Sequence, residues 1–225
     1  MSLALEAAVV AGGIFLGRLL SRVVKRRRIA ARLPTGDGSG DTESASGESD
    51  GESDSETDES LEGFVCRLGD VLLRRVEGDE AWLAGALVLA EERPVAALFI
   101  APEAHGDRAI FVPGPKQTVL TWLAPVAAGE LGFASLVTPG GEPPRTLEHG
   151  GTRFERTRRL PVRVERLGTG APHVGKRAII GEYAAAGAER LLVIAGTDAA
   201  LAWRGVAMSE GEYDVLPGGK TTLHP

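Results

Sequence analysis

An acidic tract divides this chain into parts that cannot share one core. Residues 33–62 contain eleven acidic residues and no basic one, and after Leu33 the only large aliphatic residue is Leu61. Folding of this tract would bury too little apolar surface to offset the loss of conformational entropy. We therefore expect a disordered acidic linker, which like charges extend over several nanometres.

The segment before the linker, residues 1–32, predicts a membrane anchor. The stretch from Leu3 to Leu20 is interrupted only by Glu6 and Arg18, and both charges lie near its ends, where they can reach the headgroups. Extension to Val24 gives 22 residues, or about 33 Å of helix, which is enough to cross a bilayer. The anchor residues that we single out have apolar or small side chains: Leu3, Ala8, Gly13, Phe15, Gly17 and Leu20.

Four consecutive basic residues follow the apolar segment as a collar: Lys25, Arg26, Arg27 and Arg28. Positive charge beside a span is retained in the cytoplasm, so we expect a single-pass protein with its N-terminus outside and its C-terminal domain in the cytoplasm. A GxxxG pair, Gly13 and Gly17, would also allow a homodimer. The alternatives are an amphipathic helix lying on the membrane, a targeting peptide, and a helix docked on another protein.

After residue 62 the pattern changes to short apolar runs separated by glycine, proline or charged pairs. This rhythm is typical of an all-β fold, and we expect a mainly β domain over residues 63–225, either a β-sandwich or a partly open β-barrel. Two β subdomains, and short helices within 81–92 and 183–189, remain alternatives. The predicted strands are 64–76, 82–89, 95–101, 109–112, 118–124, 133–138, 153–157, 162–167, 177–184, 190–195 and 201–208.

Several apolar residues are predicted to form the core of this domain. The runs 95–100 and 191–194 are apolar at every position, which favours central strands buried on both faces. We expect Cys66 to be a small buried residue. The three tryptophans also lie in apolar runs and are predicted to pack in the core: Trp82, Trp122 and Trp203.

The charge distribution limits the partners of the domain. Residues 1–32 hold seven basic side chains and one acid, and the whole chain has a net charge of −6, so the part after the linker is nearly neutral. It lacks the positive field that attracts nucleic acid, and we predict no nucleic-acid partner. Membrane lipid and a protein are the expected partners. A single cysteine, Cys66, excludes an intramolecular disulfide and a cysteine metal cluster.

No motif in the sequence satisfies the requirements of a catalytic, cofactor or metal site. Residues 218–221 end like a phosphate-binding loop, but Asp214 stands where that motif requires glycine. Four histidines lie in predicted loops, without a second ligand at metal-binding spacing: His105, His149, His173 and His224. We therefore assign no catalytic, cofactor-binding or metal-ligating residue.

One cluster combines an aromatic ring with basic residues, as an exposed binding platform would. It consists of Arg153, Phe154, Arg156, Arg158 and Arg159. Such a patch could bind an acidic peptide, anionic headgroups or the acidic linker of this chain. The alternative is an outer strand whose arginines pair with the glutamates at positions 148, 155 and 165.

Together these features predict a membrane-tethered cytoplasmic interaction or scaffold domain. The alternatives are a membrane-anchored enzyme with a site built from loops around His149 and His173, and a component of a cell-envelope assembly. A cleft with converging titratable groups would favour the enzyme, whereas an exposed sheet edge or apolar patch would favour binding.

Overall fold

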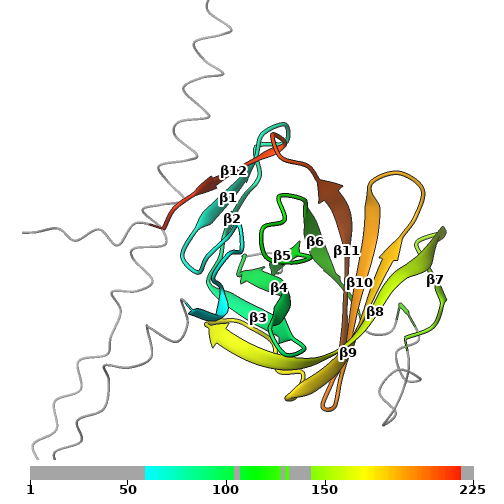
Figure 1. Ribbon diagram of the computed structural model, residues 1–225. Helices are drawn as coiled ribbons and strands as arrows, with labels where there is room; N and C mark the ends of the chain where they lie inside the picture. Colours follow the sequence, from blue (N-terminus) through cyan, green and yellow to red (C-terminus); the bar gives the residue numbers. More distant parts are fainter. Residues whose placement is uncertain (1–58, 104–106, 128–129, 132–142, 219–225) are drawn as a thin grey trace, which may run out of the picture. The chain divides into compact units, whose positions relative to one another are not determined.

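The computed structural model describes residues 59–103, 107–127, 130–131 and 143–218. The predicted anchor, its collar, almost all of the acidic linker and the strand predicted at 133–138 lie outside these residues. Within the described part of the chain, no helix is long and apolar enough to cross a membrane. The same part forms twelve β-strands, so the prediction of a mainly β fold is confirmed (Figure 1).

The strands fall into a small sheet and a large one. The small sheet has the order β12-β1-β2 and consists of β1 (Val71–Arg74), β2 (Glu80–Trp82) and β12 (Tyr213–Leu216). The large sheet begins with a four-stranded meander: β3 (Gly85–Ala90), β4 (Pro94–Ala101), β5 (Arg108–Val112) and β6 (Leu120–Val126). It continues with β7 (Thr146–His149), β8 (Thr152–Gly168), β9 (Arg177–Ala184), β10 (Glu189–Gly196) and β11 (Ala200–Met208).

Eight strands of the large sheet close into a barrel with the order β3-β4-β5-β6-β11-β10-β9-β8, because β8 also pairs with β3. The ring consists of two meanders, β3 to β6 and β8 to β11. Their first strands pair with each other, and so do their last strands, always antiparallel. Closure satisfies the edges that an open sheet would leave unpaired. The two halves are therefore parts of one closed sheet.

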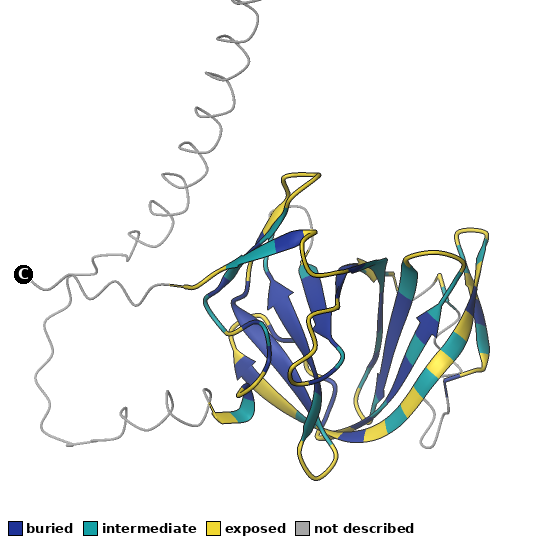
Figure 2. Ribbon diagram, turned by 45° about the horizontal axis from the view of Figure 1, so that its top comes forward, coloured by how far each residue is buried: buried dark blue, intermediate teal, exposed yellow. Residues whose placement is uncertain are grey.

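The longest strand, β8, joins two predicted strands into one. Along one edge it pairs with β9, and along the other it pairs first with β7 and then with β3. Figure 2 shows exposed residues alternating with half-buried or buried ones along most of this strand. The register slips by one residue between Arg156 and Arg158, so Thr157 forms a β-bulge.

Alternate side chains of the described strands fill the inside of the barrel. Every barrel strand contributes to this core, whose larger members are Leu87, Leu89, Leu98, Ile100, Phe111, Leu123, Val162, Ile180, Leu192, Ile194 and Trp203. A barrel of about eight strands is just wide enough for such filling. The two cavities described below lie at the ends of the barrel.

Two further cores lie on the outside of the barrel. The small sheet and residues 61–68 cover the first meander, where Cys66 is fully buried, as predicted. The hairpin of β7 and the first part of β8 covers the outer face of β9 to β11 and buries Phe154 and Tyr183. The predicted central strands, β4 and β10, are buried on both faces and paired on both edges, which confirms that prediction.

Other predictions require correction. Trp122 and Trp203 are buried as predicted, but Trp82 is 46% exposed. Alternation along β2 turns the small side chain of Ala81 into the core and the neighbouring indole outward. The helices considered for 81–92 and 183–189 do not form, because these residues belong to strands and the turns between them.

Candidate functional site

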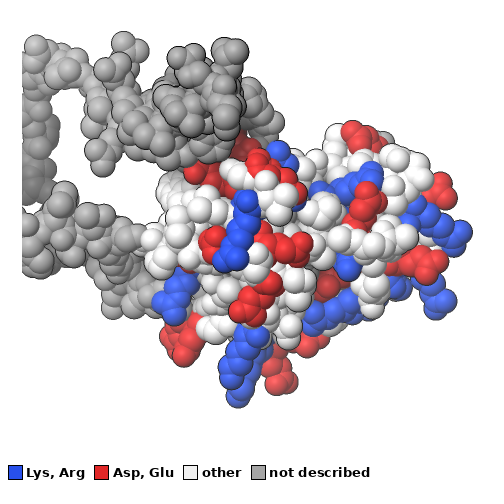
Figure 3. All heavy atoms as spheres, turned by 90° about the horizontal axis from the view of Figure 1, so that it is seen from above, with Lys and Arg blue, Asp and Glu red and all other residues white. Residues whose placement is uncertain are grey.

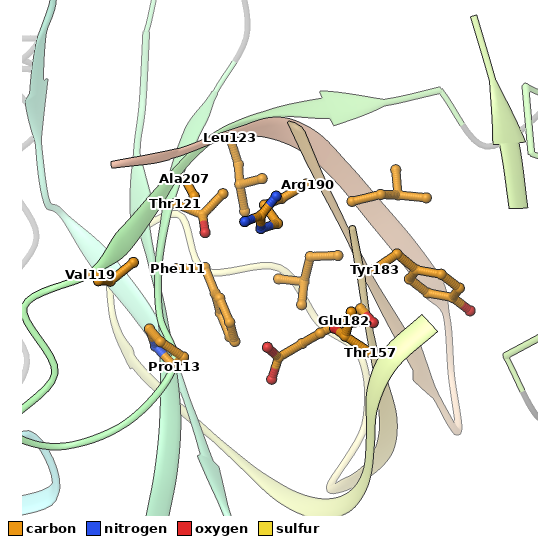
Figure 4. Close-up of a pocket in the computed structure, with 12 residues that line it drawn as sticks. Phe111, Pro113, Val119, Thr121, Leu123, Thr157, Glu182, Tyr183, Arg190 and Ala207 are labelled. Atoms are coloured by element: carbon orange, nitrogen blue, oxygen red, sulfur yellow. Dashed lines mark hydrogen bonds between the residues drawn. The ribbon is translucent and has the colours of Figure 1, made fainter. Parts of the chain in front are cut away.

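The candidate site is a cavity of about 140 Å³ at one end of the barrel. It lies where β5 and β9 end and β6 and β10 begin, and Figure 4 shows the residues that line it. We call it the mouth and define it by Phe111, Thr121, Leu123, Glu182, Arg190 and Leu192. The order of the strands around the barrel thus brings together residues that are up to about eighty positions apart in the sequence.

The floor of the mouth is apolar. Phe111, Leu123 and Leu192 come from β5, β6 and β10, and each is at most 4% exposed. Phe111 lies opposite Thr121 in the pairing of β5 with β6, so both belong to the last rung of the barrel at this end. The floor is therefore the end of the interior core, and a ligand could cover it without displacing a packed side chain.

Glu182 supplies a carboxylate to the apolar floor. It follows Ala178 and Ile180 on the inward face of β9, and its side chain is 20% exposed. Arg158 Nη1 lies 3.2 Å from Glu182 Oε1. Burial raises the pKa of Glu182, while the charge and hydrogen bond of Arg158 lower it, and the balance leaves the pKa above its usual value.

The bulge at Thr157 explains why Arg158 reaches this carboxylate. Before the bulge, Phe154 packs in the outer core; after it, Leu160 and Val162 pack inside the barrel. The extra residue inverts the alternation of β8, as β-bulges do, so Arg158 turns toward Glu182 and also donates to the backbone oxygen of Pro113 at 3.2 Å. The β-bulge thus places Arg158 beside Glu182 at one side of the mouth.

Arg190 supplies the positive charge of the mouth. Its Nη1 donates to the backbone oxygens of Gly187 at 2.9 Å and Glu189 at 2.8 Å. Among the described residues, its guanidinium has only these backbone partners. Figure 4 shows Arg190 and Glu182 on opposite sides of the cavity, with the hydroxyl of Thr121 close to the arginine side. Because the charge of Arg158 neutralises that of Glu182, the charge of Arg190 gives the mouth a local excess of one positive charge.

The predicted patch on β8 is not one surface. Arg153 is exposed and Arg159 lies on the outside, but Arg156 donates to the backbone oxygen of Pro143 and Arg158 turns to the mouth. Phe154 is fully buried, beneath the guanidinium of Arg204 at 5.4 Å from its ring centroid. Its ring therefore offers no exposed platform. The bulge separates the members of the patch, and only Arg158 contributes to the candidate site.

The two histidines considered for an enzyme site lie at opposite ends of β10. His149 Nε2 is 2.6 Å from Glu130 Oε2, and Arg204 joins the backbone oxygen of His149 to Glu189 at the start of β10. His173 Nε2 is 2.9 Å from Asp198, in the turn after β10. The structure does not bring these histidines together. The described residues also contain no group of three or more side chains suited to hold a metal ion.

A second cavity of about 240 Å³ lies at the other end of the barrel. It is larger than the mouth but has fewer charged groups, because Asp107 is the only charged side chain among the described residues that line it. Trp203 and Ile100 form part of its apolar wall. We therefore regard the mouth, which combines an apolar floor with both signs of charge, as the better candidate.

Sequence patterns alone did not single out Glu182 and Arg190. A signal was present, because each continues the inward alternation of an apolar strand: Glu182 after Ile180, and Arg190 before Leu192. A charged residue at such a position must either lie at a barrel end or have a partner. That signal can be used only when it is known which face of each strand points into the barrel.

Replacement of Glu182 by glutamine should change how stability depends on pH. The pKa of Glu182 is raised in the folded protein, so the stability that it contributes is fully present below the pKa of the unfolded chain and is lost as pH rises through the folded pKa. Glu182→Gln should therefore gain stability relative to wild type as pH rises above about 4. Urea unfolding across this range measures the difference.

Glu155→Gln is the matched control, because the side chain of Glu155 is 75% exposed on the same sheet. Its unfolding free energy should stay close to that of wild type, because an exposed ion pair contributes little to stability. Parallel curves for wild type and Glu182→Gln would contradict the assignment of a raised pKa to the carboxyl in the mouth.

The surface around the barrel carries charges of both signs. On the face seen in Figure 3, acidic and basic side chains are interspersed rather than gathered into a field of one sign. Comparison with known proteins adds no assignment: no protein-family model, no curated protein and no solved structure matches this chain.

Proposed function

We propose that this protein is a membrane-tethered cytoplasmic binding domain, and that its barrel captures a protein partner through the mouth. The anchor and collar predicted from residues 1–32 would supply the membrane contact, and the acidic linker would give the domain its reach. The partner would insert one apolar side chain into the cavity, and a carboxylate of the partner next to that side chain would bind Arg190. The cavity over Phe111, Leu123 and Leu192, with Arg190 at its side, is the observation that carries this proposal.

The size of the cavity favours a single side chain as its occupant. Pockets for drug-sized ligands and cofactors measure roughly 300 to 1,000 Å³, whereas the mouth holds about 140 Å³. Protein interfaces concentrate their binding energy in a few apolar or aromatic anchors that fill small pockets. An apolar anchor would bury the floor, which is already desolvated on its inner side.

The charges favour an acidic neighbour for that anchor. Arg190 Nη1 is occupied by two backbone oxygens, and no hydrogen bond from its Nε or Nη2 to a described residue is found. Its position is therefore fixed while donors remain for a carboxylate, and charged hydrogen bonds of this kind are stronger than neutral ones. Glu182 already has Arg158 as its counterion, so the partner's carboxylate would bind on the side of Arg190, and this would orient the partner.

A fragment with the two required features tests the mouth directly. Methyl-labelled full-length protein in lipid nanodiscs would be titrated with 3-phenylpropionate, which joins an aromatic ring to a carboxylate. The methyl signals of Leu123 and Leu192 should shift, and the neutral 3-phenylpropanamide should bind more weakly. Arg190→Glu should abolish the carboxylate preference, whereas Arg153→Glu, which reverses an exposed arginine outside the mouth, should retain it.

Absence of any shift at Leu123 and Leu192 would contradict the mouth as a binding site. Equal shifts with the acid and the amide would leave an apolar pocket but contradict the role of Arg190. The membrane part is tested separately: full-length protein should resist carbonate extraction, and a chain beginning at Gly63 should not.

An enzyme remains the second candidate because of one observation, the raised pKa of Glu182 in a cavity, which is a property of general acids. The site for that activity would be the mouth, not His149 and His173. The two proposals differ in their dependence on Glu182. Glu182→Gln should retain fragment binding if the mouth only binds, whereas any turnover by the protein should be lost.

A further inference from the structure

Two cationic side chains, Arg163 and Arg177, lie side by side on the outer face of β8 and β9, and we call them the basic cluster. Both residues are exposed. Arg163 lies directly opposite Arg177 in the pairing of β8 with β9. Like charges at such positions repel each other, so an anion bound over this pair would relieve the repulsion.

The contacts of the basic cluster leave its charge unbalanced. Arg163 Nη2 donates to the backbone oxygen of Glu91 at 2.8 Å, which is a neutral acceptor. Among the described residues, no member of the cluster forms an ion pair with a carboxylate. Glu165 lies in the same stretch of β8, but its Oε2 accepts a hydrogen bond from Ser60.

The contact of Ser60 with Glu165 shows where the acidic linker meets the barrel. Ser60 Oγ lies 3.0 Å from Glu165 Oε2, and the next residue, Leu61, is 2% exposed in the outer core. The end of the linker is thus held on β8, two residues from Arg163. Two strand residues span about 7 Å, so the linker reaches the domain beside the basic cluster.

We propose that the basic cluster is a docking surface for this chain's own acidic linker. The linker carries eleven acids and no base, and acids at positions 50, 52, 54, 56 and 58 are separated from one another by single uncharged residues. An extended chain covers up to about 3.5 Å per residue, so the acids at 54, 56 and 58 can reach the cluster from Ser60. Covalent attachment gives them a high effective concentration there.

This contact would regulate the reach of the domain. A docked linker holds its last residues against the barrel and leaves less free length toward the membrane, while release restores the full tether. The contact is electrostatic and exposed, so salt weakens it, because the Debye length falls from about 10 Å at 0.1 M to about 3 Å at 1 M. Neutralisation of the cluster by its linker would also keep the domain from anionic headgroups.

A spin label in the linker tests the proposal. Ser53→Cys would be labelled in full-length protein in nanodiscs of neutral lipid, where the buried Cys66 stays unlabelled. The amide signals of Arg163 and Arg177 should broaden more than those around Arg153. High salt should remove the excess broadening, and so should the double variant Arg163→Glu, Arg177→Glu.

The control is Arg145→Glu, Arg153→Glu, which makes the same change of charge at two exposed residues near the hairpin of β7 and β8, outside the cluster. It should retain the broadening at Arg163 and Arg177. Uniform broadening over the barrel, or broadening that survives charge reversal of the cluster, would overturn the proposal. It would also be overturned if the label left the cluster unaffected while vesicles with phosphatidylserine perturbed these amides, because the occupant would then be lipid.

Discussion

Replacement of Gly205 by alanine should open the seam where the two meanders meet and strongly destabilise the protein. Gly205 lies opposite Leu123 in the pairing of β11 with β6. An added Cβ would lie 1.8 Å from the backbone oxygen of Trp122 and 2.9 Å from the Cα of Leu123. Both obstacles are backbone atoms, so no side-chain rotation can relieve the clash.

The strands must therefore separate, and the barrel loses hydrogen bonds along one of its two closures. Overpacking costs roughly 1 to 3 kcal/mol, and occasionally more; we expect Gly205→Ala at the upper end of that range or beyond it. Urea unfolding should show the loss. The mouth should also be affected, because Leu123 is part of its floor and lies opposite Gly205.

Gly114→Ala is the matched control for this experiment. An added Cβ at Gly114 would meet its nearest neighbours, Gln117 Cγ and the oxygen of Val95, at 3.5 and 3.6 Å, which is ordinary contact. Its midpoint of unfolding should stay close to that of wild type. Equal stability of Gly205→Ala and wild type would show that β6 and β11 do not meet as closely as the closed barrel requires.

Cys66 should react with thiol reagents far more slowly in the folded protein than after unfolding. The residue is fully buried, and burial, with a further contribution from Asp70, raises the pKa of its thiol from 9.0 to about 12. At about pH 8 this shift lowers the thiolate fraction about a thousandfold. Because the thiolate is the reactive form and the side chain is also inaccessible, alkylation should report unfolding.

An internal control comes from Val76→Cys, because Val76 is 86% exposed in the turn between β1 and β2. In that variant, mass spectrometry should find one alkylated thiol within minutes and the second only after denaturant is added. Rapid alkylation of Cys66 without denaturant would contradict the packing of residues 61–68 against the first meander.

Local sequence patterns predicted most of the strands, because each depends on the alternation of a few residues. The strand predicted at 177–184 has the bounds of β9, and the apolar run at 95–100 lies within β4. Closure of the barrel was not predictable in this way. It depends on the pairing of β3 with β8, in which Gly85 lies opposite Gly168, and no short pattern encodes a contact across such a separation.

The candidate site was harder to predict than the fold for two physical reasons. The bulge at Thr157 inverts the alternation of β8, so a cluster that looks continuous in sequence is divided between the outside and the mouth. Of the predicted patch, only Arg158 contributes to the mouth, through Glu182. The other reason is that Glu182 and Arg190 can be recognised as site residues only when it is known which face of β9 and β10 points into the barrel.

The central claim is that the mouth captures a protein partner, and site-specific photo-crosslinking tests it most directly. A photoreactive residue would replace Val119, which is 44% exposed at the rim of the cavity, or Val76, which is exposed in the turn between β1 and β2. In cells that make the protein, position 119 should give a discrete adduct that position 76 does not give. The second substitution Arg190→Glu should remove that adduct. Identical adducts from both positions, or an adduct at 119 that survives Arg190→Glu, would contradict the claim.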